Sequence, residues 1–479
     1  MMGYQKILFV KLPDRFLENE FVFQQQGPHY LQAYLAQFGI PSDLLILFES
    51  ASERKFRLLK GETSHTLSQL TMLLIENTGR FIEQPFNSSV FSNYNVVALS
   101  VMTPQARDAY LLSTLINLEF PNTITAIGGS HARYYLNEVI NLPYEKAFDF
   151  VIPHDGWEPI LGIATDQSRS EKKSQIISHK FSNLNKITAP PTRPIPLMER
   201  YNFEIAGVKA FHTITALGCP YSCNFCEAGG ETLRKFSYEL IFKDLQEVSK
   251  CHIELGRSKY GVMFFDDVGL LSPSQVEILS QLVKKSGFTT WRAFTHAFLV
   301  NKYKESLLKP FQLTGGRRIG MGLETGSQES LDLINKRNGK KQYVWEHYEA
   351  VRIANKLGIA VDAFTMIFPW EDEPDLEQTT KLIKFIAENP VEGLDEKGRP
   401  LKNSVDSTIM TPYKGTKLYD MINHGEIKGV KLKNDLDYSD YFYKGIAGKS
   451  GWPYEETILS KERYGKEQVV RNAMRPAYR

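Results

Sequence analysis

The chain has 479 residues, of which 42% are hydrophobic and 23% are charged, and its formal net charge is +2. This is the composition of a folded protein with two or three domains and an ample core. The small net charge gives no electrostatic reason to expect nucleic acid or an anionic membrane as a partner. No apolar run reaches the ~18 residues of a membrane span, and the N-terminus lacks a signal-peptide pattern, so we expect a cytoplasmic protein.

Short apolar runs alternate with helical patterns over residues 1–165. This alternation predicts an α/β domain with a doubly wound parallel sheet. No G-x-G-x-x-G pattern opens a helix here, so we do not expect a dinucleotide site. The predicted strands are 6–10, 44–48, 95–101, 124–129 and, as the last, 148–152, and the predicted helices include 29–38 and 105–118.

Ligands of such sheets bind at the carboxyl ends of the strands. Three of the predicted strands end in loops with small or polar residues, namely Ser100–Pro104, Gly128–His131 and His154–Glu158. Glycine permits close approach of the backbone to a ligand or a tight turn, and the hydroxyl groups can donate to phosphate or amide groups. These loops are therefore candidate binding elements.

Residues 166–205 have the composition of a linker. The segment begins with polar residues, and 189–196 holds four prolines in eight residues. Proline at this density favours an extended, semi-rigid chain. We expect it to connect the first domain to a second one that begins near residue 206.

From residue 206 to 411 a strand pattern and a helix pattern follow each other repeatedly. Six such units predict a partial (βα)6 barrel rather than a closed eight-stranded barrel, with a C-terminal extension over 412–479. Barrels of this kind place their chemistry at the carboxyl ends of the strands. The predicted strands are 212–217, 260–265, 289–295, 317–323, 359–367 and 405–411, and the predicted helices are 237–250, 273–286, 301–311, 328–357 (broken near 338–339) and 375–388.

Three of the four cysteines, Cys219, Cys223 and Cys226, follow the first predicted barrel strand with C-x3-C-x2-C spacing. Three thiolates can hold three irons of a [4Fe–4S] cluster and leave the fourth iron without a protein ligand. A structural zinc site would need four ligands, usually in two pairs, and disulfides need an oxidising compartment. The remaining alternative is that the three cysteines are unrelated buried thiols. We expect the fourth cysteine, Cys251, to be a buried structural thiol.

With Phe225 just before the last cysteine, this motif resembles that of the radical S-adenosylmethionine (SAM) superfamily. In that family the open iron binds SAM, and one-electron reduction yields a 5′-deoxyadenosyl radical that abstracts hydrogen from an unactivated carbon. The resemblance implies a [4Fe–4S] cluster and SAM as cofactors, with Phe225 near the adenine. It also implies an electron donor such as flavodoxin or ferredoxin as a partner.

Further along the barrel, Gly322–Glu329 resembles the family's strand-four segment, which implies that Glu324 and Ser327 contact SAM. Asp266, after the second strand, is assigned to SAM in the same way. The alternative for these residues is that they only cap helices. The strand-five segment departs from the family pattern, because Phe368 and Trp370 stand where glycine is usual, and this bulk would reshape the pocket.

Residues 1–165 resemble the cobalamin-binding domain of one large subgroup of this superfamily. No D-x-H-x-x-G motif marks a histidine as the lower cobalt ligand, and His131 fits a hydrogen-bonding role better than a ligand role. The residues that the resemblance assigns to cobalamin, if it is bound, are Leu12, Ser100, Thr103, Gly128, Gly129, His131 and Glu158.

These resemblances favour cobalamin-dependent methyl transfer to an unactivated carbon of a small metabolite or natural-product intermediate. One alternative is radical SAM dehydration, epimerisation or rearrangement without cobalamin, with a purely structural first domain. Another is a non-catalytic iron–sulfur or corrinoid-binding protein. No catalytic residue is assigned, and the aromatic tail segments 437–443 and 451–454 could either cover a substrate at the barrel mouth or pack against the barrel bottom.

Overall fold

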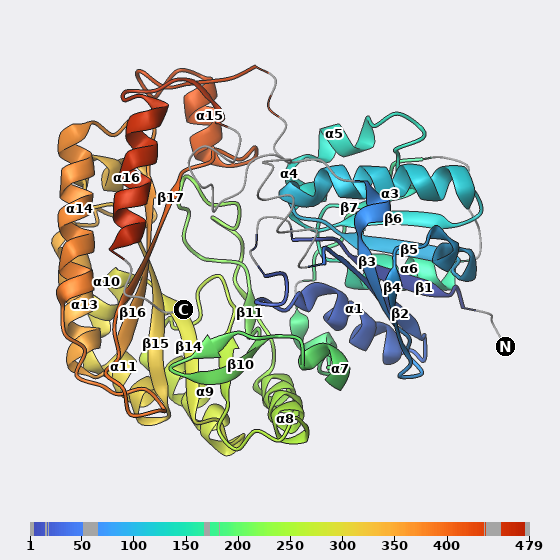
Figure 1. The fold of residues 1–479 in the computed structure, drawn as a ribbon, viewed down its shortest axis with the longest axis horizontal. Helices are drawn as coiled ribbons and strands as arrows, with labels where there is room; N and C mark the ends of the chain where they lie inside the picture. Colours follow the sequence, from blue (N-terminus) through green and yellow to red (C-terminus); the bar gives the residue numbers. More distant parts are fainter. Residues whose placement is uncertain are drawn as a thin grey trace. The chain divides into compact units, whose positions relative to one another are not determined.

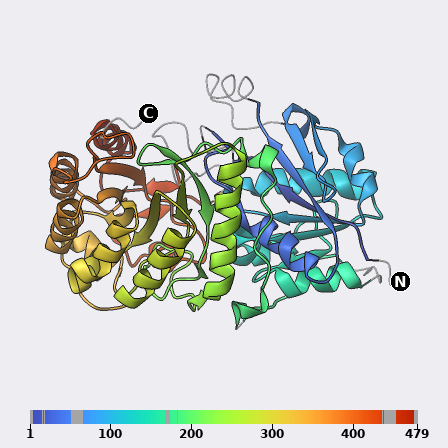
Figure 2. The same cartoon turned by 90° about the horizontal axis from the view of Figure 1, so that it is seen from below.

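The computed structural model describes residues 4–14, 17, 19–50, 66–166, 173–181, 183–434, 436 and 452–474. The chain forms two compact units, of which unit 1 comprises Met1–Arg200 and unit 2 begins at Tyr201 (Figure 1) (Figure 2). The boundary between the units lies within the proline-rich stretch 166–205. No helix in the described part of the chain combines the length and the apolar character needed to cross a bilayer.

Unit 1 is built on an eight-stranded sheet with the order β4-β3-β2-β1-β5-β6-β7-β8. Six neighbouring strands of this sheet pair in parallel, in the order β2-β1-β5-β6-β7-β8. This confirms the predicted doubly wound α/β fold. The parallel strands are β1 (Ile7–Lys11), β2 (Ser42–Phe48), β5 (Val96–Ser100), β6 (Ile124–Gly128), β7 (Phe150–Ile152) and β8 (Gln175–Ile176).

Two features of this sheet differ from the prediction. β3 (Thr71–Ile75) and β4 (Phe81–Pro85) form an antiparallel hairpin on β2, so the sheet is not parallel throughout. β4 is an outer strand that ends at a proline, and outer strands of this kind lack the apolar run that predicts a strand. β7 is not the last strand either, because the two-residue β8 pairs beside it.

Helices cover both faces of the unit 1 sheet (Figure 1). Leu8 and Val10 of β1 point into a core that α3 closes, and the alternating residues Ile7 and Phe9 point to the opposite face. The helices are α1 (Gln26–Ala36), α3 (Ala106–Glu119), α4 (Ser130–Tyr134), α5 (Leu136–Ile140), α6 (Trp157–Thr165) and α7 (Ile195–Met198).

The chain order of the strands reverses between β1 and β5, and such a switch point opens a crevice at the carboxyl edge of the sheet. The loops on either side of it are tied together by Gln105. Its Nε2 donates to Leu12 O at 3.2 Å and to Asp14 Oδ1 at 2.8 Å, and Lys11 pairs with Asp14 at 2.9 Å. This buried network fixes the edge where a ligand of unit 1 would bind.

Unit 2 is built on a seven-stranded sheet with the order β17-β16-β15-β14-β13-β10-β9. Six of its strands are parallel and β9 (Glu204–Ile205) is an antiparallel edge, which confirms the predicted partial (βα)6 barrel. The parallel strands are β10 (Val208–Thr213), β13 (Gly261–Phe264), β14 (Thr290–Thr295), β15 (Gly316–Glu324), β16 (Ala360–Ile367) and β17 (Ser404–Ile409).

Helices lie on the outer side of this curved sheet (Figure 1). The predicted helix 301–311 is in fact two helices, because Lys304 adopts a φ of 48° between them. The predicted helix 328–357 breaks over 334–344, as its Asn338-Gly339 pair indicated. The helices are α8 (Tyr238–Glu254), α9 (Pro273–Lys285), α10 (Ala297–Tyr303), α11 (Glu305–Leu313), α12 (Gln328–Leu333), α13 (Trp345–Lys356) and α14 (Glu373–Glu388).

The predicted first barrel strand, 212–217, also differs in detail. β10 starts earlier, and Ala216–Leu217 (β11) leaves the sheet to pair with β12 (Arg234–Lys235) in a two-stranded ribbon. The hydrogen bonds of this ribbon hold the two ends of the loop that carries the cysteines.

Beyond β17 the chain forms α15 (Lys417–Asn423), β18 (Lys431–Leu432), β19 (Tyr454–Glu456) and α16 (Lys461–Ala473). α16 packs against β17 and α14. Its Arg471 is fully buried, pairs with Glu467 at 2.9 Å and donates to the carbonyls of Met366 and Leu376, both at 3.3 Å. The last helix is therefore built into unit 2.

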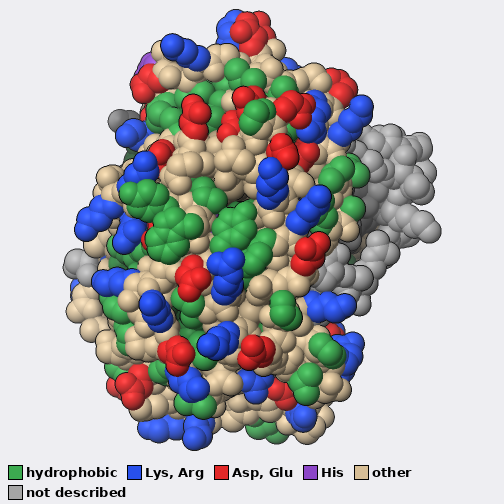
Figure 3. Space-filling view, turned by 90° about the vertical axis from the view of Figure 1, so that its left-hand side faces the viewer, with side chains coloured by type: hydrophobic (Ala, Val, Ile, Leu, Met, Phe, Trp, Pro, Cys, Tyr) green, Lys and Arg blue, Asp and Glu red, His purple; other side chains and the backbone are tan. Residues whose placement is uncertain are grey.

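The outer face of unit 2 carries lysine, arginine and acidic side chains of both signs, interspersed with small apolar areas (Figure 3). Exposed pairs such as Lys381 and Glu377 on α14, 3.0 Å apart, are typical of it. Pairs of this kind contribute little to stability.

Candidate functional site

The loop that follows β11 brings the three predicted cluster cysteines together at the carboxyl end of the barrel. Cys219 is buried, Cys223 and Cys226 are half-buried, and all three are free thiols. The loop winds tightly, since Cys226 N donates to Cys223 O and Gly229 N donates to Cys226 O, both at 3.1 Å. Three thiols are thus presented within one compact stretch of backbone.

The thiols are close enough to influence one another. Burial raises the pKa of Cys219 and Cys223 to about 11 and that of Cys226 to about 12. In each case the charge of a neighbouring cysteine adds to the rise. The thiols favour the neutral form on their own, and thiolate chemistry here requires a positive partner such as a metal centre.

The three cysteines are not arranged as the ligands of a single metal ion, because no three His, Cys, Asp or Glu side chains in the described part of the chain converge as one ion would require. A [4Fe–4S] cluster binds each cysteine through a different iron, so its ligands need not converge on one point. A Cβ on Gly229 would lie 3.0 Å from both Cys223 O and Cys226 O, so a side chain there would push against the backbone of the cysteine loop.

The turn between α12 and α13 grips the cysteine loop from outside. Asn338 Oδ1 accepts from Ser222 N at 2.6 Å and from Ser222 Oγ at 2.9 Å, and Asn338 Nδ2 donates to Pro220 O at 2.8 Å. Asn224 N donates to Ile334 O at 2.9 Å and Asn224 Nδ2 to Leu333 O at 2.7 Å. We call residues 334–340 the clamp turn.

Phe225 joins an apolar cluster at the barrel mouth. Its neighbours in that cluster include Phe368 and Trp370 after β16, and Met410 after β17. Phe368 and Trp370 stack on each other with ring centroids 4.7 Å apart. The bulky residues that replace the usual glycines therefore fill the region around Phe225.

The C-terminal segment also contributes to this cluster. Trp452 packs against it, and Tyr454 is buried in it and donates from its hydroxyl to Met410 O at 2.6 Å. These two tail aromatics therefore lie at the carboxyl end of the barrel and not at its bottom. The other predicted tail aromatics, 437–443, lie outside the described residues.

Glu324 ends β15 in an unusual conformation. Its φ is +63°, and the register of β15 against β16 shifts between Gly322 and Glu324. Such backbone is uncommon for a residue with a side chain and clusters at functional positions. The carboxylate does not cap α12, because Ser327 does so through its hydroxyl, which accepts from Ser330 N at 3.2 Å. Ser327 also donates to Asp375 at 2.6 Å, so its hydroxyl proton is already in use.

The partner of Glu324 is Lys336, which sequence reasoning did not single out. Lys336 Nζ lies 2.6 Å from Glu324 Oε1 and donates to Gly322 O as well. Both side chains are buried. A lysine in a polar turn twelve residues after a glutamate carries no sequence signal of such a pair.

Asp266 accepts hydrogen bonds from the residues that lead into the cysteine loop. It accepts from Thr215 N and Thr215 Oγ1, both at 2.6 Å, and from Ala216 N at 3.1 Å, and burial raises its pKa to about 6. It does not cap α9, because Ser272 does. The neighbouring Asp267 is the acid whose charge reaches Cys219 and Cys226.

His296, directly after β14, lies against the cysteine loop. Its ring meets Tyr221 edge to face at 4.6 Å and stacks on Phe298 at 5.1 Å. Burial lowers its pKa to about 3, so the imidazole is neutral, and its Nδ1 has no hydrogen-bond partner among the described residues. The ring can therefore offer a hydrogen bond to a ligand at the mouth.

In unit 1, two of the residues assigned to cobalamin have structural partners. His131 is buried on α4, with its Nε2 2.6 Å from the Tyr110 hydroxyl and its ring stacked on Tyr135 at 4.9 Å. Glu158, in the first turn of α6, accepts from the Tyr34 hydroxyl at 3.1 Å.

The glycine and leucine positions of unit 1 are also constrained by packing. Gly129 has a φ of +93°, and a Cβ there would lie 2.6 Å from Val101 O, so the fold itself requires glycine. The Leu12 side chain lies in the core, so only its backbone faces the crevice edge. Ser100 and Gly128 end β5 and β6 side by side and are half-buried.

Three buried polar atoms at this edge of unit 1 have no hydrogen-bond partner among the described residues. They are Thr103 Oγ1 after β5, Trp157 Nε1 after β7 and His29 Nδ1 in the first turn of α1. Buried polar groups are normally satisfied, so these atoms indicate where a polar ligand would bind. The amide side chains of a corrin both donate and accept hydrogen bonds and fit this set.

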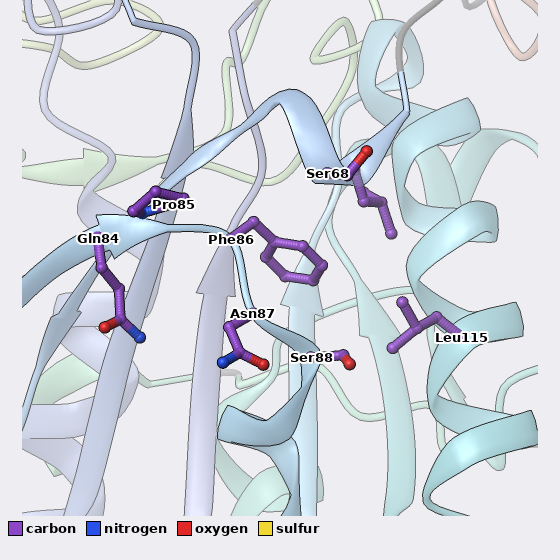
Figure 4. Close-up of a pocket in the computed structure, with 8 residues that line it drawn as sticks. Ser68, Gln84, Pro85, Phe86, Asn87, Ser88 and Leu115 are labelled. Carbon is purple, nitrogen blue, oxygen red and sulfur yellow. The ribbon is translucent and has the colours of Figure 1, made fainter.

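A separate hollow of about 550 Å³ lies at the outer edge of unit 1 (Figure 4). It is open, and Phe86 points into it from the end of β4. It contains none of the predicted site residues. Its lining consists of Leu67, Ser68, Gln84, Pro85, Phe86, Asn87, Ser88 and Leu115.

Comparison with known proteins identifies the class of the barrel. Residues 213–383 match the family model of the radical SAM superfamily. An uncharacterized methyltransferase of Pyrococcus horikoshii is 24% identical over 345 residues, which are 68% of this chain and 69% of the relative. An anaerobic magnesium-protoporphyrin IX monomethyl ester cyclase of Cereibacter sphaeroides is 24% identical over 313 residues, 60% of this chain and 49% of that protein.

The fold is similar to that of a cobalamin-dependent S-adenosylmethionine radical enzyme, OxsB, solved with aqua-cobalamin and SAM bound. The TM-score is 0.66 at 13% sequence identity, covering 98% of this chain and 66% of OxsB. The present chain thus spans about two thirds of OxsB and about half of the cyclase.

Residues 213–383 therefore form a radical SAM domain, and the fold of the chain is that of proteins which join such a barrel to a cobalamin-binding-type domain. The match indicates an enzyme, and the radical SAM domain implies a [4Fe–4S] cluster and SAM as cofactors.

Proposed function

We propose that this protein is a cobalamin-dependent radical SAM methyltransferase that acts on an unactivated carbon of a small molecule. The observation that carries the proposal is the joining, in one chain, of a radical SAM barrel with a cobalamin-type sheet whose carboxyl edge holds unpartnered buried polar atoms. The name of the Pyrococcus horikoshii relative supports methyl transfer. When bound, the reduced cluster and SAM supply a 5′-deoxyadenosyl radical, and methylcobalamin supplies the methyl group.

In this proposal Cys219, Cys223 and Cys226 hold the cluster, and the clamp turn keeps their loop closed over it. Phe225 packs beside the adenine of SAM. Glu324 faces the ribose or amino group, and Asp266 acts indirectly, by fixing the strand from which the cysteine loop departs. The apolar cluster around Phe368 excludes water from the mouth, which protects a radical from side reactions.

Cobalamin would be held at the switch point of unit 1. The Ser100 and Thr103 hydroxyls and the backbone of Gly128 and Gly129 border the crevice edge, and Trp157 offers its indole N–H. We assign no cobalt ligand to His131, because its Nε2 is engaged by Tyr110 and its ring is buried between aromatic neighbours. The protein would therefore hold the cofactor without a histidine from that loop.

The second candidate is a radical SAM reaction without methyl transfer, such as dehydration, epimerisation or rearrangement. The similarity to the cyclase of Cereibacter sphaeroides favours it. In that case unit 1 would contribute structure or bind another ligand. Both candidates use a small-molecule substrate and a one-electron reductant such as flavodoxin or ferredoxin.

The test is anaerobic purification and cluster reconstitution in the presence of hydroxocobalamin, followed by assay with SAM and a reductant. We expect bound iron and sulfide, the visible spectrum of protein-bound cobalamin, and formation of both 5′-deoxyadenosine and S-adenosylhomocysteine. Formation of 5′-deoxyadenosine alone, without retained cobalamin, would favour the second candidate. Cys226→Ser should lose the cluster, whereas Cys251→Ser, which changes a buried thiol on α8, should keep it.

A further inference from the structure

We propose that Lys336 is a positioning residue for electron transfer: its buried ammonium makes the cluster easier to reduce, and Glu324 sets how strongly it does so. This inference rests on the cluster part of the proposed function and does not depend on which reaction follows. It concerns a residue whose sequence context is an ordinary polar turn.

The first support is the burial of the pair. Lys336 and Glu324 have side chains that are 2% and 9% exposed, with Nζ and Oε1 2.6 Å apart. A charge so little exposed to water is weakly screened, so its field extends over neighbouring groups. Buried pairs of this kind seldom increase stability over an apolar pair, so stability alone gives little reason for one at this place.

The second support is where the pair lies. Lys336 belongs to the clamp turn, and its neighbours Ile334 and Asn338 hydrogen-bond the cysteine loop on either side of Cys223. The Lys336 charge opposes the burial-driven rise in the pKa of Cys219 and Cys223, while Glu324 adds to that of Cys223 and Cys226. The ammonium thus acts on Cys219 and Cys223, the carboxylate acts on Cys223 and Cys226, and the two charges oppose each other at Cys223.

The third support is that the backbone makes room for the pair. A Cβ on Gly322 would lie 2.3 Å from Glu324 Oε1 and 2.8 Å from Lys336 Nζ, so a side chain there would displace the two charged groups from their present places. Lys336 also donates to Gly322 O, and Glu324 keeps its strained φ of +63° at the bulge. These features hold the ammonium at one place instead of letting it swing to solvent.

The electrostatic consequence follows from the sign of the charges. Reduction adds one electron to the cluster, and the potentials of such clusters depend on nearby charge, hydrogen bonds and burial. A fixed positive charge beside the ligands stabilises the reduced state and raises the potential. A negative charge does the opposite, so the two members of the pair should act in opposite directions.

The experiment is an EPR-monitored redox titration of the reconstituted protein without SAM or cobalamin. Glu324→Gln should shift the midpoint potential to more positive values than wild type, because it leaves the ammonium uncompensated. Adding Lys336→Met in that background should shift the potential back to more negative values. Lys336→Arg, which keeps the charge, should stay near wild type.

Lys341→Met is the matched control. Lys341 lies in the next residues of the chain but is exposed and pairs with Asp332 at 3.7 Å, so its charge is screened by water. Its removal should leave the potential unchanged.

The proposal is overturned if Lys336→Met does not move the potential in the Glu324→Gln background. Lys336 would then serve only to hold Glu324 in place. The same holds if Lys341→Met shifts the potential as much as Lys336→Met. The double variant leaves neither charge buried alone, so it can be measured even where Lys336→Met by itself does not fold. Because neither SAM nor cobalamin is present, loss of methyl transfer as a function would not alter the outcome.

Discussion

Replacing Asn338 should weaken the grip of the clamp turn on the cysteine loop. Asn338→Gly is the informative change, because Asn338 has a φ of +51° that glycine adopts without strain, so only the side chain is lost. Three hydrogen bonds then disappear, two to Ser222 and one to Pro220, with lengths from 2.6 to 2.9 Å. Each contributes about 0.5–1.5 kcal/mol net, and the lower half of that range applies because Asn338 is exposed.

The sum is about 2 kcal/mol, or roughly a 30-fold shift toward the open loop. We expect iron to be released to a chelator faster by about that factor under anaerobic conditions. Asn301→Ala serves as the control, because Asn301 donates to Glu346 O at 2.7 Å and joins α10 to α13 without touching the cysteine loop. If Asn338→Gly releases iron at the wild-type rate, or Asn301→Ala accelerates release equally, the clamp turn does not retain the cluster.

Three other changes test the rest of the structure. Gly129→Ala places a Cβ 2.6 Å from Val101 O at a φ of +93° and should destabilise unit 1 by about 2 kcal/mol in urea unfolding. Arg471→Met removes a buried guanidinium that binds Glu467 and the carbonyls of Met366 and Leu376, leaves Glu467 only the partly exposed Arg463 as a cationic partner, and should cost unit 2 about 3 kcal/mol, seen as a lower urea midpoint. Burial raises the pKa of Glu371 from 4.5 to about 7, so the folded state holds a proton that the unfolded chain has lost, and stability should fall as pH rises from 4.5 to 7. Glu371→Gln should flatten that part of the pH profile, and an unchanged slope would assign it to another group.

The parallel strands of both units, apart from β8, could be predicted because they are buried and read as short apolar runs. Residues Ile7–Lys11, for example, are buried without exception. β4 and β8 could not be predicted in that way, because their outward residues include Glu83, Gln84 and Gln175. These edge strands are defined by the neighbour they pair with, β3 for β4 and β7 for β8, and not by an apolar run of their own.

The cysteine motif could be predicted because its three ligands lie within eight residues of one another. The clamp turn could not, because Asn338 meets Ser222 across 116 positions of the chain. In sequence, Asn338-Gly339 reads as an ordinary turn that breaks a helix. Gly129 shows the converse: its sequence context suggested close approach by a ligand, whereas the structure shows close approach by Val101.

The packing of the C-terminal residues around Phe225 sets an order of events during synthesis. Leu418 N donates to Asn224 O at 2.7 Å, and Tyr454 completes the same apolar cluster. Domains generally fold from the N-terminus as the chain emerges, so unit 1 can form while the cysteine loop still lacks half of its surroundings. The cysteine loop would therefore acquire its full surroundings only after the C-terminal segment has been synthesised.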